Sequence, residues 1–209
     1  LTTLIIIILS IFGISKLEVE NSFINYFNKD TEIYKGMKLI DEKLGGTTPL
    51  EIIIKFPNNK DDVVNDDEFE DWDNEQDQDS NKYWFTKDKV EKIKIVHNYL
   101  DSLPEIGKVI SFSSILEAAK QLNNNKELGT LEMGVLYSKL PESIKKQIVD
   151  PYISIEDNEA RVSVRIKDSL KDLRRNDLIK KINNDLKTKF NLSESEFKLA
   201  GVLILFNNL

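Results

Sequence analysis

The sequence predicts an α+β domain of the ferredoxin-like split βαβ type, a mixed sheet with helices on one face, because two strand–helix–strand units packed side by side place their strands in one sheet. The first unit is predicted over residues 17–56 and the second over residues 159–200. A mostly helical segment, residues 86–149, is inserted between them. We expect the whole domain to span residues 16–200 and to follow an uncharged N-terminal helix, residues 1–15.

The N-terminal helix is predicted from an apolar run in which the first charged residue is Lys16. Four consecutive Ile residues flanked by Leu leave no polar face, so a helix here must be buried in protein or in lipid. Its length alone fits a secretion signal, a core helix or part of a membrane helix. Because no basic region precedes it and Ser15-Lys16-Leu17 is a poor cleavage site, we expect the outer end of a first membrane helix. A second apolar run, residues 201–209, is expected to begin the next membrane helix.

The first unit is predicted to contain a strand at 17–20, a helix at about 30–44 and a strand at 49–56. Asp30 is the expected N-cap of the helix. The apolar residues that fall on one face of this helix are Ile33, Met37, Ile40 and Leu44. Gly45-Gly46 should end the helix, since glycine readily adopts the left-handed conformation at the position after the last turn. Pro49 begins the strand, whose alternation predicts one well-buried face.

The inserted segment begins with a predicted helix at 86–103, capped by Thr86, and a short strand at 108–112. His97 lies at the edge of the apolar stripe of that helix, and we expect a neighbouring group to satisfy it. Ser113 or Ser114 should cap the next helix.

The rest of the chain is predicted to contain short helices at 130–140 and 142–149, followed by a break at Asp150-Pro151. The second unit then comprises a strand at 160–166, the longest helix at 170–190, and a last strand at 196–199. The candidate caps for that helix are Asp168 and Ser169, and Gly201 follows the last strand.

An acidic insert over residues 57–85 accounts for the negative charge of the chain, which is −7 overall. Low hydrophobicity with high charge favours a solvated loop. Cation binding is the weaker alternative, because carboxylates alternate along part of the insert, at Asp71, Asp73, Glu75 and Asp77. The pattern departs from a calcium loop, since Gln76 stands where Gly is needed and Lys82 where Glu is needed.

Composition excludes several classes of site. The chain has no cysteine, which rules out disulfides and thiolate metal sites, and its single histidine argues against a zinc enzyme or a Ser-His-Asp triad. No phosphate loop, nucleophile elbow or dinucleotide fingerprint is present, and no basic patch with aromatics indicates nucleic acid. We therefore predict no catalytic residues, no cofactor and no enzymatic activity. Composition and spacing alone indicate an extracytoplasmic domain between two membrane segments.

Several short segments taken in order resemble one family. They are Asn25-Tyr26-Phe27, Asp30-Thr31, Leu44-Gly45-Gly46-Thr47, Pro49-Leu50-Glu51-Ile52, Tyr83-Trp84-Phe85-Thr86, His97-Asn98-Tyr99-Leu100-Asp101, Gly107-Lys108-Val109-Ile110-Ser111, Asp150-Pro151-Tyr152-Ile153-Ser154, Arg175-Asn176-Asp177-Leu178-Ile179 and Gly201-Val202-Leu203. The chain resembles the first large extracytoplasmic loop of a resistance–nodulation–division (RND) exporter, between transmembrane helices 1 and 2. The branch is that of the MMPL-like lipid exporters and the hopanoid transporters. It departs from the family at Asn28, where Pro is usual, and in the length of its acidic insert.

The resemblance implies a porter domain of a proton-driven exporter in the bacterial inner membrane, on the periplasmic side. Its partners would be the lipid bilayer, the second porter domain of the same transporter and a hydrophobic or lipid substrate, with alternating access by movement of the repeats. The acidic residues that relay protons in such exporters lie in membrane helices outside this segment. The alternative is a membrane-anchored sensor or adaptor ectodomain without transport, and an extracytoplasmic hydrolase has no residue pattern to support it.

Overall fold

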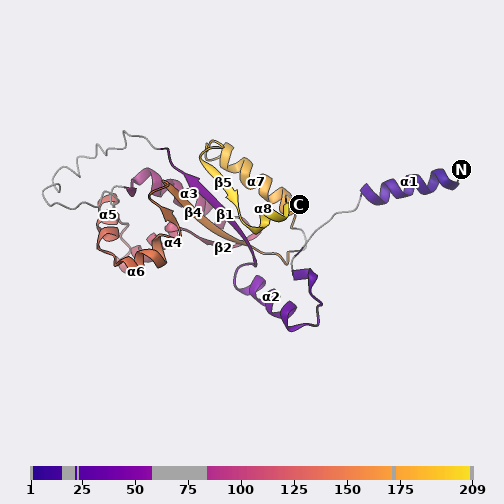
Figure 1. Cartoon of the computed structure of the whole chain (residues 1–209), viewed down its shortest axis with the longest axis horizontal. Helices are drawn as coiled ribbons and strands as arrows, with labels where there is room; N and C mark the ends of the chain where they lie inside the picture. Colours follow the sequence, from indigo (N-terminus) through magenta and orange to yellow (C-terminus); the bar gives the residue numbers. More distant parts are fainter. Residues whose placement is uncertain (1, 16–21, 23, 58–83, 171–172, 208–209) are drawn as a thin grey trace.

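The computed structural model describes residues 2–15, 22, 24–57, 84–170 and 173–207 of the chain. Their strands form one antiparallel sheet in which β2, β4, β1 and β5 are neighbours in that order and β3 pairs with β4 (Figure 1). The strands are β1 (Thr48–Lys55), β2 (Ile106–Ile110), β3 (Ile153–Ser154), β4 (Glu159–Ile166) and β5 (Phe197–Ala200). The α+β class is confirmed, but the prediction of a mixed sheet is wrong, because every neighbouring pair among the described strands is antiparallel.

The sheet is antiparallel because two strand–helix–strand connections interleave. Both β1 and β2 run antiparallel to β4, so they are parallel to each other with β4 between them, and α3 (Lys87–Asp101) lies between them in the sequence. In the same way, β4 and β5 enclose β1 and are joined through α7 (Arg175–Thr188). The second predicted strand–helix–strand unit, 159–200, is therefore observed, and the described strands form another such unit over 48–110. The strand 17–20 that would begin the first predicted unit lies outside the described residues.

One face of the sheet forms the core. In β1 the side chains of Leu50, Ile52 and Ile54 are fully buried, and they alternate with more exposed neighbours. The same alternation along β4 directs its apolar side chains to this face. Helices α3 and α7 supply the apolar side chains that complete the core, including Ile93, Val96, Leu100, Leu178, Ile182 and Leu186. Each buried side chain of this size contributes roughly 1.5–3 kcal/mol, so this layer holds the domain together.

Helix α2 (Glu32–Lys43) differs from its prediction in its N-cap and in the burial of its apolar face. Thr31, not Asp30, is its N-cap, because the Thr31 hydroxyl accepts the Tyr34 amide hydrogen. The apolar face predicted to cover the sheet is instead exposed, by 57% at Ile33, 41% at Ile40 and 62% at Leu44. The crossover position on the sheet belongs to α3, and α2 lies at one end of the sheet (Figure 1).

The helical insertion is shorter than predicted, since α3 and β2 belong to the sheet layer. It comprises α4 (Phe112–Leu122), α5 (Thr130–Lys139), α6 (Glu142–Ile144) and a π-helix (Lys145–Val149). Ser111 caps α4 in a capping box with Ser114, so the predicted cap is displaced toward the N-terminus. The break at Asp150-Pro151 is confirmed, because the π-helix ends just before it.

Two short apolar helices flank the domain in sequence. They are α1 (Thr2–Ser15) and α8 (Val202–Asn207), and α8 packs against β1 with Leu203 buried. Among the described residues, no helix combines the length and the apolar character needed to cross a bilayer. The predicted strand 17–20 and the carboxylates Asp71, Asp73, Glu75 and Asp77 lie outside the described residues.

Candidate functional site

Ser22, which follows α1 in the sequence, and Gly201, which precedes α8, lie at the same end of the sheet. Register pairs Thr48, at the start of β1, with Ile166, at the end of β4, and β5 ends beside Glu51 at Ala200. Gly201, which leads into α8, follows at once. Ser22, which follows α1 in the sequence, is hydrogen-bonded to Asp168, two residues after β4. Ser22 and Gly201 therefore both lie at the end of the sheet around Thr48 and Ile166.

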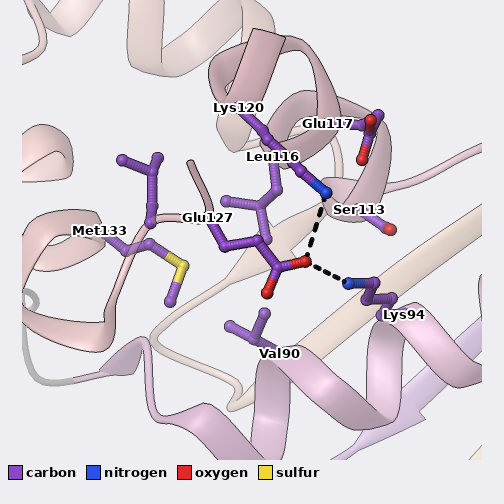
Figure 2. Close-up of a pocket in the computed structure, with 9 residues that line it drawn as sticks. Val90, Lys94, Ser113, Leu116, Glu117, Lys120, Glu127 and Met133 are labelled. Atoms are coloured by element: carbon purple, nitrogen blue, oxygen red, sulfur yellow. Dashed lines mark hydrogen bonds and ion pairs between the residues drawn. The ribbon is translucent and has the colours of Figure 1, made fainter. Parts of the chain in front are cut away.

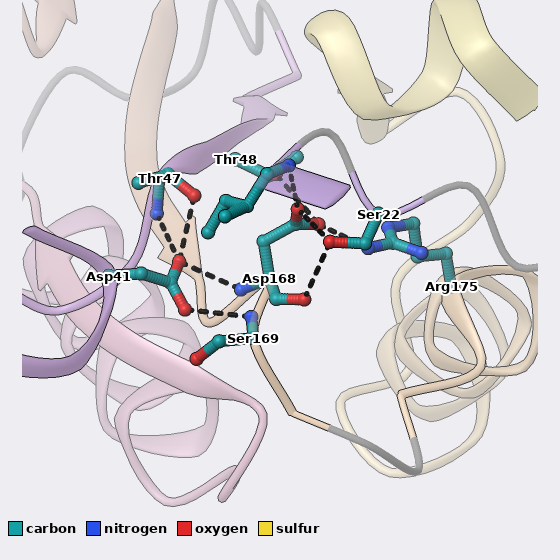
Figure 3. Close-up of polar contacts among 8 residues, drawn as sticks. Ser22, Asp41, Thr47, Thr48, Asp168, Ser169 and Arg175 are labelled. Atoms are coloured by element: carbon teal, nitrogen blue, oxygen red, sulfur yellow. Dashed lines mark hydrogen bonds and ion pairs between the residues drawn. The ribbon is translucent and has the colours of Figure 1, made fainter. Parts of the chain in front are cut away.

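Asp168 is the first of two buried carboxylates that organise this end of the sheet (Figure 3). Its Oδ2 accepts hydrogen bonds from the Ser22 hydroxyl at 2.8 Å and from the Ile24 amide at 3.3 Å. Its Oδ1 accepts from the Thr48 hydroxyl at 3.3 Å and from the guanidinium of Arg175. Asp168 thus joins the segment after α1, the start of β1 and the first turn of α7, and it does not cap a helix as predicted.

Asp41, on α2, is the second carboxylate and is fully buried. Its Oδ1 accepts from the amide and the hydroxyl of Thr47, at 2.9 and 2.7 Å, and from the Asp168 amide at 2.8 Å. Its Oδ2 accepts the Ser169 amide hydrogen at 2.8 Å. Burial acts to raise the pKa of Asp41, but the hydrogen bonds from Ser169, Thr47 and Asp168 outweigh it and lower the pKa below the ordinary value. We call Asp41, Asp168 and their hydrogen-bond partners the aspartate junction.

Glycines allow the backbone to pack tightly at the aspartate junction. Gly45 and Gly46 follow α2 with φ of +87° and +105°, as predicted for its end. A Cβ on Gly46 would lie 2.5 Å from the Ile166 carbonyl oxygen, so a larger residue would push the α2–β1 turn away from β4. Gly201, with φ of +112°, passes close to the Pro49 carbonyl at the exit into α8.

The motif residues predicted from the sequence divide between the two ends of the sheet. Gly45, Gly46, Pro49 and Gly201 meet at the end that contains the aspartate junction. Asp150 and Pro151 instead precede β3, which pairs with the first residues of β4 at the opposite end.

A groove of about 360 Å³ lies between α7, β5 and α8. Its apolar lining consists of Ile179, Phe197, Leu199 and Ile204. On its polar side, the Lys187 ammonium pairs with Glu194 at 2.5 Å. Its size falls in the range of small-ligand pockets, and its mixed lining suits a molecule with an apolar body and a polar end.

A smaller pocket of about 90 Å³ lies between α3, α4 and α5 (Figure 2). Val90, Leu116 and Met133 form its apolar part. At the rim, Glu127 accepts hydrogen bonds from Lys94 at 3.2 Å and from Lys120 at 3.4 Å. The bond and charge of Lys94, followed by those of Lys120, lower the pKa of Glu127. The pocket is too small for a lipid chain, and Lys94 and Lys120 in its lining are both paired with Glu127.

The remaining polar candidates have structural partners. His97 Nδ1 lies 2.9 Å from the Ser111 hydroxyl, which confirms that a neighbouring group satisfies this histidine. Within the described ranges, no three histidine, aspartate or glutamate side chains are grouped so as to hold a metal ion. Sequence reasoning did not single out Asp41. Its position four residues after Met37 and just before Gly45-Gly46 indicates a carboxylate that can accept hydrogen bonds from the turn after α2.

Comparisons of the chain with protein-family models, with curated proteins and with solved structures find no match in any of the three.

Proposed function

We propose that this chain is the extracytoplasmic porter domain of a proton-driven RND-type exporter that binds and conducts hydrophobic or amphiphilic, lipid-like molecules. The observation that carries the proposal is that Ser22, which follows α1 in the sequence, and Gly201, which precedes α8, lie at the same end of the sheet. A domain between two membrane helices needs its entry and exit on the side that faces the bilayer. The family resemblance of the sequence motifs supports the same function.

Within this proposal, the fold is the ferredoxin-like split βαβ arrangement. The strand order β2-β4-β1-β5 supports it, because each strand–helix–strand connection skips one strand and the two connections interleave. The helical insertion, residues 112–149, lies between the two units in sequence. The partner in the proposal is the second porter domain of the same transporter, and the proton-relay residues lie in membrane helices outside this segment.

The groove between α7, β5 and α8 is the proposed point of contact with substrate. It combines apolar side chains such as Leu199 and Ile204 with the Lys187–Glu194 pair, as an amphiphile requires. It also adjoins α8, the segment that would continue into the membrane. An amphiphile leaving the outer leaflet could therefore keep its apolar part covered as it enters the domain.

The complete reading frame of the gene tests the architecture. We expect two repeats of six membrane helices, with Asp in the fourth helix of each repeat. A single membrane anchor joined to a signalling module would contradict the exporter and favour the sensor or adaptor alternative.

Native mass spectrometry of the intact protein tests the lipid path. We expect co-purified lipid, and Leu199→Asn should lower the bound fraction because it places an amide in the apolar lining of the groove. Lys198→Asn is the matched control, since Lys198 alternates with Leu199 along β5 and is exposed. Absence of lipid from the intact protein, or equal loss in both variants, would count against the groove.

A further inference from the structure

Helix α2 has an apolar stripe that no described part of the domain covers. Its members are Ile33, Ile40 and Leu44, exposed by 57%, 41% and 62%. At about 100° per residue these three positions fall within about 40° of one another on the helix. Lys38 and Glu42, which form an ion pair at 3.8 Å, lie about 140–180° away on the opposite side. Helix α2 is therefore amphipathic, with its apolar side toward the surroundings.

The stripe belongs to a helix that is firmly held. Asp41 is fully buried and accepts hydrogen bonds from Thr47, Asp168 and Ser169, and Met37 and Tyr34 are half-buried on neighbouring parts of the helix. Gly46 packs against the Ile166 carbonyl just beyond the C-terminus of α2. Rotation of the helix to bury the stripe would break these contacts, so the fold itself directs the stripe outward.

The position of α2 indicates what covers the stripe. The helix leads into Thr47 and Thr48, so it joins the sheet end at which Ser22 and Gly201 lie. Tyr26, in the short 3-10 helix just before α2, is 67% exposed, and tyrosine is enriched at membrane interfaces. Lys43 is exposed between the stripe and the polar side, where a long cationic side chain can reach lipid headgroups.

We propose that the apolar stripe of α2 lies in the interfacial layer of the lipid bilayer, so that α2 rests on the membrane beside the segments that enter it. The inference rests on the proposed function, since it requires the chain to be anchored in a membrane. A second copy of the chain is the other possible occupant. Three side chains on one short helix offer far less than the roughly 1,200–2,000 Å² that a stable protein interface buries, so the bilayer fits better.

Site-directed spin labelling tests this directly, because the chain has no native cysteine. The full chain is reconstituted into phosphatidylcholine and phosphatidylglycerol vesicles with a nitroxide at Ile40→Cys or Leu44→Cys, and at Glu42→Cys as the control on the opposite face. Collision with oxygen, which concentrates in lipid, is compared with collision with a water-soluble nickel chelate. We expect the ratio of oxygen to nickel collisions to be several-fold higher at positions 40 and 44 than at position 42.

The outcomes separate this inference from the proposed function. If the chain floats with the vesicles but positions 40 and 44 give the aqueous ratio of position 42, the bilayer contact is overturned and membrane anchoring stands. Dipolar broadening between labels at position 40 would show a second copy on the stripe and would also overturn it. If the chain does not float with the vesicles, the proposed function and this inference fall together.

Discussion

The Oδ1 atom of Asp41 accepts the amide hydrogen of Asp168 at 2.8 Å across 127 residues of sequence. The Asp168 carboxylate in turn accepts from Ser22, so the two aspartates connect α2, β4 and the segment that follows α1. Hydrogen bonds to a charged acceptor are stronger than neutral ones, and both carboxylates are shielded from water. In the proposed porter domain, this junction would transmit movement between the membrane segments and the sheet.

Replacing Asp41 with Asn should destabilise the fold by about 2–3 kcal/mol, because an amide nitrogen would face backbone N–H groups that now donate to a carboxylate. Chemical denaturation of the chain in detergent measures this loss. Glu42→Gln, one residue along on the exposed side of α2, is the control and should change stability by less than about 0.5 kcal/mol. Equal effects of the two substitutions would show that the hydrogen bonds of the Asp41 carboxylate do not stabilise the fold.

Two glycine substitutions should have opposite signs. Gly46→Ala places a Cβ 2.5 Å from a backbone oxygen at a φ of +105°, and should cost at least about 2 kcal/mol. Gly36→Ala lies within α2, where a Cβ would meet nothing within 4 Å, and should raise stability by about 0.5–1 kcal/mol. Thermal unfolding of both variants measures the difference. A stabilising Gly46→Ala would contradict the close approach of the α2–β1 turn to β4.

The single histidine should make stability depend on pH. Burial lowers the pKa of His97, although the nearby charge of Asp101 opposes the shift. The unfolded chain therefore binds a proton on His97 more readily than the folded chain does. The free energy of unfolding is highest above about pH 6.5, the pKa of a histidine in the unfolded chain, and it decreases as the pH drops through the lower pKa of His97 in the folded chain.

Replacement of His97 with Asn should reduce this dependence. The Asn amide can take the place of Nδ1 beside the Ser111 hydroxyl but does not titrate. Urea denaturation at pH 7.5 and 5.5 should give a smaller difference in the free energy of unfolding for the variant than for the parent chain. The same difference in both proteins would assign the pH dependence to other groups.

The residues on the two sides of the acidic insert lie close together, because Phe56 and Trp84 stack edge to face at 5.6 Å and Asn158 bonds to both sides. Asn158 donates to the carbonyl oxygens of Phe56 and Pro57 at 3.1 and 3.2 Å, and it accepts from the Trp84 indole nitrogen at 2.8 Å. Because the ends are adjacent, a short Gly-Ser linker in place of residues 58–83 should change stability by less than about 1 kcal/mol. Chemical denaturation of the shortened chain checks this. A loss of several kcal/mol would mean that residues 58–83 contribute to the core.

Local patterns predicted β1, β2, β4, β5 and most helices of this domain, but they missed β3 and did not predict which elements pack together. Alternation located β1 and β4, and the apolar spacing of Ile179, Ile182 and Leu186 predicted residues that α7 buries. The same spacing on α2 suggested a crossover helix, because periodicity identifies an apolar face without saying what covers it. The aspartate junction could not be predicted, since Asp41 and Asp168 meet only through the folded sheet.

Transport by the complete protein in vesicles is the most direct test of the proposed function. The product of the full gene is reconstituted with a fluorescent phospholipid analogue, a pH gradient is imposed, and the movement of the analogue out of its leaflet is followed. We predict movement that stops when a protonophore collapses the gradient and that slows in the Leu199→Asn variant but not in Lys198→Asn. Folded, inserted protein that moves no lipid under any gradient would contradict the assignment as a porter domain.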